Sequence, residues 1–144
     1  IEDNITIPSM RDMGTFLSDK KLNEFADLYA KQMQTKMVNV KQYVSALSGG
    51  NKQKVVFGKW IGRESQVLIL DCPTRGVDIG VKRAMYQLMT ELKQQGKSIV
   101  MISEELPELI GMSDRLMILK DGQVSHIFER SADLTDAQII GYMI

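Results

Sequence analysis

A serine followed by two glycines is the first stretch of this sequence whose residue types suit the binding of an anion. The stretch is Leu47–Lys52 (LSGGNK), and a helical pattern follows it to about Ile61. Two glycines let the backbone come close to a ligand, and Ser48 adds a hydroxyl beside the free N–H groups that open the helix. Helix N-termini equipped in this way bind phosphate. A plain loop with a helix cap would also explain these residues, so both interpretations stand at this point.

A second stretch brings an aspartate to the end of an apolar run. It is Val67–Asp78 (VLILDCPTRGVD), and its first four residues predict a parallel strand covered on both faces. Asp71 would then stand at the carboxyl end of a strand, where open α/β sheets bind ligands, and its carboxylate could hold Mg²⁺ through water. Aspartates at the ends of buried strands also cap loops, which is the structural alternative for Asp71.

A cysteine follows this aspartate directly and raises the possibility of a thiol nucleophile. A phosphatase-like loop would place an arginine several residues beyond Cys72, but Arg75 is only three residues away. The single histidine, His126, lies in a predicted hairpin on one face with Val124 and Phe128, which favours a structural role. A reactive cysteine needs a helix N-terminus or a cation to lower its pKa, and the sequence offers neither. Thiol catalysis is therefore not the favoured interpretation.

Residues 1–64, which contain the serine and glycine pair, are predicted to be mostly helical. Apolar residues at helical spacing predict one helix from an N-cap at Ser18 to about Met33. Residues 34–46 have no clear period and are expected to connect it to a second helix, which follows the glycine pair and is closed by Gly62.

Residues 65–144 have an α/β pattern that places the aspartate stretch. Asp78 is expected to cap a helix that Gly96 ends, and a strand at 98–102 follows it. Strand, helix and strand together predict a βαβ unit with a right-handed crossover. The remaining elements are expected to be a short helix that Pro107 begins, a third strand at 116–119, a strand at 124–128 reached through the turn Asp121–Gly122, and a last helix from about Thr135.

The bulk composition excludes several classes of partner and site. The 144 residues fit one small domain or a piece of a larger one, and 18 basic residues balance 18 acidic ones. There is consequently no field that would draw the chain to nucleic acid or to an anionic membrane. One cysteine cannot form an internal disulfide, which fits the cytoplasm, and the apolar runs are far shorter than the roughly 20 residues of a membrane span. The sequence opens without methionine, so we expect an excised fragment.

In order and spacing, these motifs resemble an ABC-type ATPase from its helical subdomain to its end, over nearly the whole chain. The motif LSGGN, together with Pro73–Gly80 (PTRGVDIG) and Ser103–Glu108 (SEELPE), is most similar to the second ATPase half of fused two-cassette proteins that drive monosaccharide import. The resemblance implies a P-loop NTPase fold of the α/β class. A parallel βαβ core would carry a preceding helical subdomain and a C-terminal hairpin and helix, with ATP and Mg²⁺ as cofactors.

The resemblance also assigns roles to individual residues. Ser48, Gly49, Gly50 and Asn51 match the signature loop, which contacts the γ-phosphate of the ATP held by the opposite cassette. Asp71 matches the Walker B aspartate that positions Mg²⁺. Asp78 matches the D-loop aspartate, which communicates across the dimer. Asn4 resembles a residue that shortly follows the Q-loop.

Two positions depart from the pattern of the family, and one of its motifs is missing. No G-x-x-x-x-G-K-[ST] occurs in the sequence, so the phosphate-cradling loop is expected in a preceding half, and the chain by itself is predicted to be inactive. Cys72 stands where the family has the glutamate that polarises the attacking water, and a neutral thiol cannot replace that carboxylate. Glu104 stands at the position of the switch histidine, where an acid would repel the γ-phosphate. The expected result is a nucleotide site with impaired hydrolysis, unless Cys72 is a variant without mechanistic meaning.

The partners implied by the resemblance are a second ATPase cassette, membrane permease subunits and, indirectly, a sugar-binding protein. The protein would then be cytoplasmic and peripheral on the inner face of the membrane. An alternative from another class is a non-hydrolytic module that docks a permease or a second cassette through residues 19–37. Met33 and Met37, with Met10 and Met13 upstream, could form an adaptable contact patch there, although such methionines are more often plain core, which is the favoured interpretation.

Overall fold

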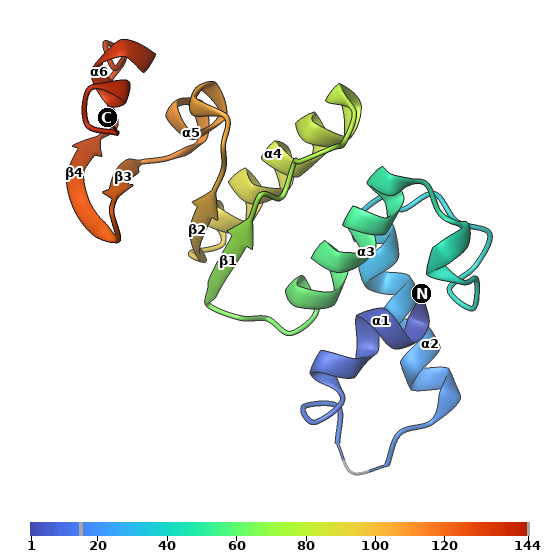
Figure 1. Ribbon diagram of the computed structural model, residues 1–144. Coiled ribbons are helices and arrows are strands. Elements are labelled where there is room, and N and C mark those ends of the chain that lie inside the picture. Colours follow the sequence, from blue (N-terminus) through green and yellow to red (C-terminus); the bar gives the residue numbers. More distant parts are fainter. Residues whose placement is uncertain (15, 144) are drawn as a thin grey trace. The chain divides into compact units, whose positions relative to one another are not determined.

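The computed structural model describes residues 1–14 and 16–143 of the chain (Figure 1). Its helices and strands follow in chain order: α1 (Glu2–Thr6), η1 (Ile7–Ser9), α2 (Asp19–Gln32), η2 (Val44–Ala46), α3 (Gly49–Ile61), β1 (Val67–Asp71), α4 (Ile79–Gln94), β2 (Ser98–Ile102), α5 (Leu106–Met112), β3 (Arg115–Lys120), β4 (Gln123–Glu129) and α6 (Asp136–Ile140). They form two compact units. The first comprises Ile1–Leu68 and Thr74–Ser98, and the second comprises Ile69–Pro73 and Ile99–Ile144. The subdomain boundary after residue 64 that composition suggested stays a prediction.

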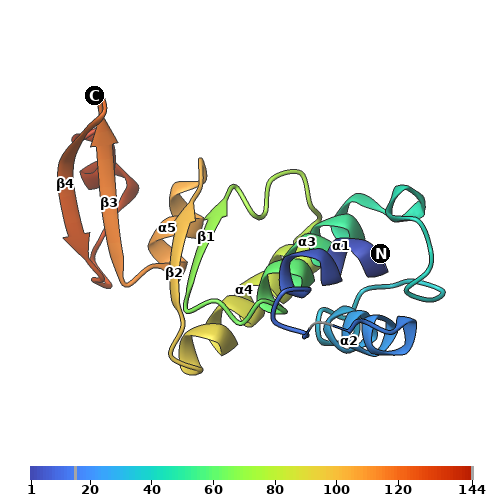
Figure 2. The ribbon, with the colours of Figure 1, turned by 90° about the horizontal axis from the view of Figure 1, so that it is seen from below.

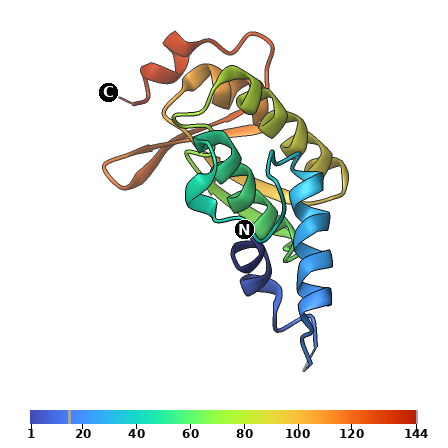
Figure 3. The same ribbon diagram turned by 90° about the vertical axis from the view of Figure 1, so that its right-hand side faces the viewer.

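In the first unit, the helices α1, α2 and α3 pack against one another (Figure 1, Figure 3). Ser18 caps α2 as predicted, because its hydroxyl accepts a hydrogen bond from the Lys21 N–H at 3.3 Å. The interior faces of the three helices are apolar, and their buried side chains are Ile5, Ala26, Tyr29, Ala30, Met33, Val55, Phe57 and Ile61. The methionine at 33 is therefore a core residue.

The sequence pattern did not predict α1, which has five residues and no side-chain cap. Contacts with a distant part of the chain hold it in place: the Glu2 N–H donates to the Val40 carbonyl at 2.8 Å, and Lys41 Nζ lies 2.7 Å from Glu2 Oε1. The hydrogen bond to Glu2 raises the pKa of Lys41, because the carboxylate favours the charged ammonium. Tertiary contacts thus create a helix where local signals are weak.

The strands β1 and β2 form a two-stranded sheet joined by the crossover helix α4. The Ser98 N–H donates to the Gln66 carbonyl and the Cys72 N–H donates to the Ile102 carbonyl, both at 2.9 Å. The first bond joins the starts of the two strands and the second joins their ends, so β1 and β2 are parallel, as the βαβ pattern predicted.

The expectation that this sheet is covered on both faces is wrong for the described chain. Ile69 of β1 is 71% exposed, and Val100 and Ile102 of β2 are each 51% exposed. Alternate residues of a strand share one face, so these three side chains lie on a face that the described residues leave uncovered. The apolar run predicted burial correctly only for the opposite face, where Leu68 is buried.

In the second unit, β3 and β4 form an antiparallel hairpin (Figure 2). Asp121 and Gly122 both have positive φ, 51° and 76°, as the predicted two-residue turn requires. The predicted third strand is therefore paired within a hairpin and not with β2. The buried core of this unit joins Leu116 and Ile118 of β3 to Ile139 of α6.

His126 takes part in an aromatic cluster on this hairpin. Its ring stacks on Tyr142 with centroids 4.2 Å apart and meets Phe128 at 4.4 Å. These contacts agree with the structural role expected for the histidine. None of the helices in residues 1–14 and 16–143 is long and apolar enough to cross a membrane.

Candidate functional site

The serine and glycine pair form the N-terminus of α3. Ser48 is the N-cap residue, with extended backbone angles of φ −62° and ψ 159°, and the helix begins at Gly49. The first N–H groups of a helix have no carbonyl partner within it, and the Ser48 side chain does not cap them. Ser48 and Gly49 are exposed. The loop therefore presents both its backbone donors and a hydroxyl to the solvent, which is the arrangement that anion binding requires.

Asn51 holds the serine hydroxyl from the first turn of α3. Its Nδ2 donates to Ser48 Oγ at 2.9 Å, and its Oδ1 accepts from the backbone N–H of Lys36 at 2.8 Å. One side chain thus joins the helix start to the loop that leaves α2. The sequence motif included Asn51, but the bond to Lys36 could not be read from it because the path of residues 34–46 had no pattern.

The two glycines differ in what surrounds them. A Cβ at Gly50 would lie 2.7 Å from Cγ2 of Val81, so a side chain at this position requires the Val81 side chain or one of the two helices to shift. A Cβ at Gly49 would meet nothing within 4 Å. Packing therefore explains the glycine at 50. Packing within the described chain does not require a glycine at 49.

The same contact brings the start of α4 close to the start of α3. Asp78 is the N-cap of α4, and its Oδ1 accepts from the Val81 N–H at 3.0 Å, as predicted. Two helix N-termini consequently lie side by side in the first unit, joined through Gly50 and Val81. Capping by itself accounts for Asp78, so a role in communication across a dimer stays a prediction.

The other candidate residues lie at the carboxyl ends of the parallel strands in the second unit. Asp71 ends β1 and is exposed, Cys72 follows it, and Glu104 comes two residues after β2 and is exposed. The Cys72 backbone has a φ of 44°, in the left-handed region that favours glycine. Because the strands are parallel, these three residues share one edge of the sheet.

A buried acid that sequence reasoning missed shapes the segment after β2. The Ser103 hydroxyl is hydrogen-bonded to Glu108 Oε2, and it accepts from the Glu105 N–H at 3.1 Å. Glu108 is buried. The spacing in SEELPE was the available signal, since Ser103 and Glu108 are its first and last residues.

The described residues do not form a metal site by themselves. No group of three or more His, Cys, Asp or Glu side chains that could hold a metal occurs among them. Mg²⁺ is commonly held by one or two carboxylates together with water and nucleotide phosphates. Asp71, exposed at a strand end, fits that kind of shared site and would not bind the ion tightly by itself.

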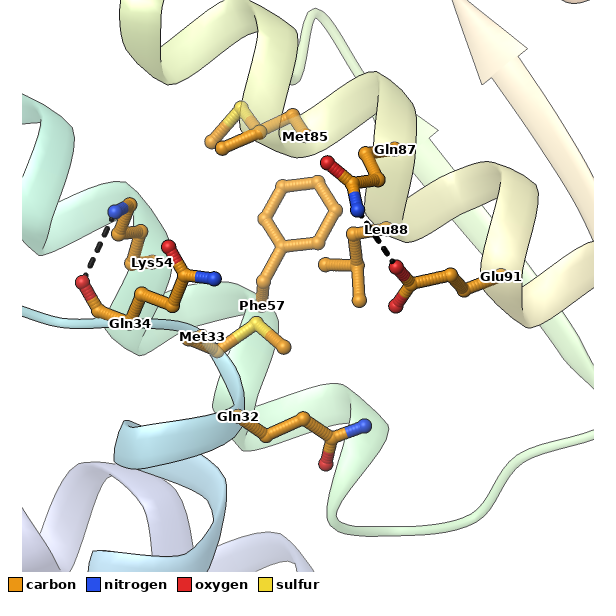
Figure 4. A pocket seen from close by; sticks show the side chains of 10 residues that line it. Gln32, Met33, Gln34, Lys54, Phe57, Met85, Gln87, Leu88 and Glu91 are labelled. Carbon is orange, nitrogen blue, oxygen red and sulfur yellow. Dashed lines mark hydrogen bonds between the residues drawn. The ribbon is translucent and has the colours of Figure 1, made fainter.

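A pocket elsewhere in the first unit is separate from these residues. The pocket is open on one side, and its volume of about 500 Å³ includes open solvent. In Figure 4, the ring of Phe57 forms the centre of an apolar floor, and amide and charged side chains surround it. The lining residues are Gln32, Met33, Gln34, Lys54, Phe57, Ala84, Met85, Gln87, Leu88 and Glu91. None of the predicted site residues lines it.

Comparison with curated proteins finds close relatives over most of the chain. The ribose import ATP-binding protein RbsA of Lactococcus lactis subsp. lactis (strain IL1403) is 46% identical over 134 residues, which are 91% of this chain and 27% of the relative. The protein of the same name from Bacillus licheniformis is 45% identical over 97% of this chain and 29% of the relative. The chain thus spans between a quarter and a third of the length of these relatives. No protein-family model matches it.

Solved structures share the fold at lower identity. The dimeric ATP-binding cassette MJ0796 bound to ADP and Pi matches with a TM-score of 0.79 and 20% identity, over 91% of this chain and 56% of that one. MJ1267, an ATP-binding cassette of an ABC transporter, matches with a TM-score of 0.77 and 18% identity, over 98% of this chain and 61% of that one. At such identities, the match establishes the fold and nothing further.

Proposed function

We propose that the intact protein powers the import of a sugar. The chain belongs to the ABC ATPase cassettes and is homologous to the ribose import ATP-binding proteins. The 42–48% identity to relatives that carry the ribose import name supports this assignment. The observation that carries the site assignment is the uncapped, exposed start of α3 beside the start of α4.

The N-terminus of α3 acts in this proposal on the ATP of a second cassette. The Ser48 hydroxyl and the first N–H groups of α3 donate hydrogen bonds to the terminal phosphate, and the helix dipole adds partial positive charge there. Phosphoryl transfer depends mainly on positioning and on stabilising charge. Donors fixed before the reaction stabilise that charge without reorganising, so this loop would raise the rate at the partner site.

The edge formed by Asp71, Cys72 and Glu104 belongs to the protein's own nucleotide site. Asp71 would hold Mg²⁺, which neutralises charge on the ATP phosphates when bound. Cys72 cannot accept a proton from water as a glutamate would, and Glu104 adds negative charge near the phosphates. The site therefore binds nucleotide but hydrolyses it slowly, whereas the signature loop still completes the partner's site.

The partners of the intact protein follow from this role. It would pair with a second ATPase cassette and contact membrane permease subunits, which receive sugar from a binding protein. It would work in the cytoplasm, peripheral on the inner face of the membrane.

The first test replaces Ser48 by alanine in the full-length protein assembled with its permease. We expect ATP turnover to fall by about 10²-fold, the usual cost of losing one preorganised donor. Lys52→Ala, an exposed position on the same helix turn, is the matched control. Two results together would instead favour a docking module. They are unchanged ATP turnover in Ser48→Ala and association of the second cassette regardless of nucleotide.

The second test restores the acid with Cys72→Glu in the full-length protein. Losing a general base costs on the order of 10²–10⁴ in rate, so the variant is expected to gain turnover at its own site. Cys72→Gln introduces a side chain similar in size to glutamate but without a carboxylate, so it should give no gain in turnover. Equal turnover in wild type and Cys72→Glu would mean that the thiol does not limit that site.

A further inference from the structure

Asn51 lies at the centre of a hydrogen-bonded chain that begins on a backbone amide. The Lys36 N–H can only donate, so the Asn51 atom that faces it at 2.8 Å must be the carbonyl oxygen. The amide nitrogen of Asn51 is thereby turned toward Ser48, whose Oγ it reaches at 2.9 Å. The orientation of the Asn51 amide is thus fixed by the loop and not by the serine.

This orientation determines what the serine hydroxyl can do. Ser48 Oγ accepts a hydrogen bond from Asn51, and its own proton is not used to cap α3, because an N-cap hydroxyl caps by accepting. An oxygen that accepts one strong hydrogen bond becomes a better donor through its own proton. The proton can therefore be offered to an acceptor in front of the helix start.

The loop at residues 34–36, where this series of hydrogen bonds begins, is itself attached to α2 and α3. Lys54 Nζ donates to the Gln34 carbonyl at 3.0 Å, as the dashed line in Figure 4 marks, and the Thr35 N–H donates to the Ala30 carbonyl at 2.9 Å. Residues 34–36 are thus attached both to the C-terminus of α2 and to α3.

We propose that Asn51 is a positioning residue that turns the Ser48 hydroxyl into a directed donor for an anionic oxygen, and that it acts through Ser48 without touching the nucleotide itself. The proposal rests on the function proposed above for the signature loop. It assigns to Asn51 a role other than the direct ligand contact that the motif suggested, and it gives the Lys36 N–H the role of fixing the orientation of the Asn51 amide.

A double-mutant cycle in the full-length protein with its permease tests this role. The variants are Ser48→Ala, Asn51→Ala and their combination, with kcat and KM for ATP measured for each. We expect Ser48→Ala to lower kcat by about 10²-fold and Asn51→Ala to lower it by roughly tenfold through misplacement of the hydroxyl. In the Ser48→Ala background, Asn51→Ala should have no further effect, because the group it positions is already absent.

Lys52→Ala is the matched control, because it truncates an exposed side chain next to Asn51 on the same helix turn and leaves both hydrogen bonds of Asn51 in place. It should keep kcat within about twofold of wild type, whereas equal losses in Lys52→Ala and Asn51→Ala would mean that the loss does not come from the hydrogen bonds of Asn51. Thermal unfolding of all variants shows whether each is folded, and the comparison of kcat is made among variants that are.

Three outcomes would overturn the proposal while leaving the proposed function intact. The first is that the losses of kcat in Ser48→Ala and Asn51→Ala multiply in the double variant, and the second is that Asn51→Ala has the kcat of wild type. The third is that Asn51→Ala raises only the KM for ATP, which would indicate direct nucleotide contact by Asn51. If Ser48→Ala itself has wild-type turnover, the proposed function of the loop fails instead.

Discussion

At Gly50, helix α3 lies directly against the Val81 side chain of α4. An added Cβ would lie 2.7 Å from the Val81 side chain, whereas one at Gly49 would meet open space. Two adjacent glycines of one motif therefore serve different purposes: one permits helix packing, and the other keeps the helix start open.

We predict that Gly50→Ala destabilises the full-length protein by about 1–3 kcal/mol, the usual cost of overpacking. Gly49→Ala is the matched control and should be neutral or slightly stabilising, because alanine favours the helix. Thermal unfolding measures both. Adding Val81→Ala should recover part of the loss in Gly50→Ala, and an equal loss in both glycine variants would contradict the packing explanation.

Tyr29 gives the first unit a pH dependence at the alkaline end. Burial raises its pKa above the ordinary value of 10.0, and the Glu64 carboxylate raises it further. A raised pKa in the folded state means that the contribution to stability is fully present below the unfolded pKa and is lost as pH rises through the folded pKa.

We predict that Tyr29→Phe loses less stability than wild type as the pH rises above about 10, because it has no phenol to ionise. Urea unfolding across this range measures the difference, and Tyr43→Phe, at an exposed ring, is the matched control. Lys41 titrates in both proteins, so the comparison isolates Tyr29. Parallel stability curves for wild type and Tyr29→Phe would contradict the expected linkage.

At the scale of elements, α6 is held to the β3–β4 hairpin by one fully buried residue. Ile139 has no exposed surface and packs with Leu116 and Ile118, while Thr135 and Gln138 form a capping box at the start of the helix. The five-residue helix depends on these tertiary contacts, since isolated helices of this length are unstable.

We predict that Ile139→Ala costs about 2–5 kcal/mol, the range for truncating a buried isoleucine. Ile140→Ala changes a neighbouring side chain that is 42% exposed and should have a much smaller effect. Hydrogen exchange of the hairpin amides reports the loss locally. Equal protection in the two variants would mean that α6 does not support the hairpin.

The elements that sequence predicted are those with local signals. The caps at Ser18 and Asp78 and the turn at Asp121–Gly122 lie where expected, because each depends on residues within a few positions. Helix α1 and the bond from Lys36 to Asn51 could not be predicted, since both depend on contacts across many residues. The exposure of Ile69 was mispredicted because an apolar run does not reveal which layer covers it.

At the scale of the whole molecule, the exposed apolar face of the β1–β2 sheet is the surface that most favours association between chains. Ile69, Val100 and Ile102 present adjoining apolar surface in the second unit, and the sequence has no net charge to oppose association. Relatives are more than three times as long as this chain, which leaves ample protein to cover such a face.

We predict that the 144-residue chain by itself associates in a concentration-dependent way and that Val100→Lys reduces this association. Val38→Lys, at an exposed residue in a loop of the first unit, is the matched control. Sedimentation velocity measures the change. In the full-length protein, Val100→Lys should instead lower thermal stability if the face is covered there. A chain that is monomeric at all concentrations would contradict the prediction.

The link between Asn51 and residue 36 uses a main-chain group at its outer end, with an evolutionary consequence. Nineteen of the twenty amino acids supply that same N–H, and only proline lacks it. Residues of different charge, size and polarity can therefore replace Lys36 without loss of this hydrogen bond. Position 51, in contrast, must keep both a donor and an acceptor on one short side chain. A comparison of side-chain identities among relatives would register the constraint at one end of this connection and overlook the other.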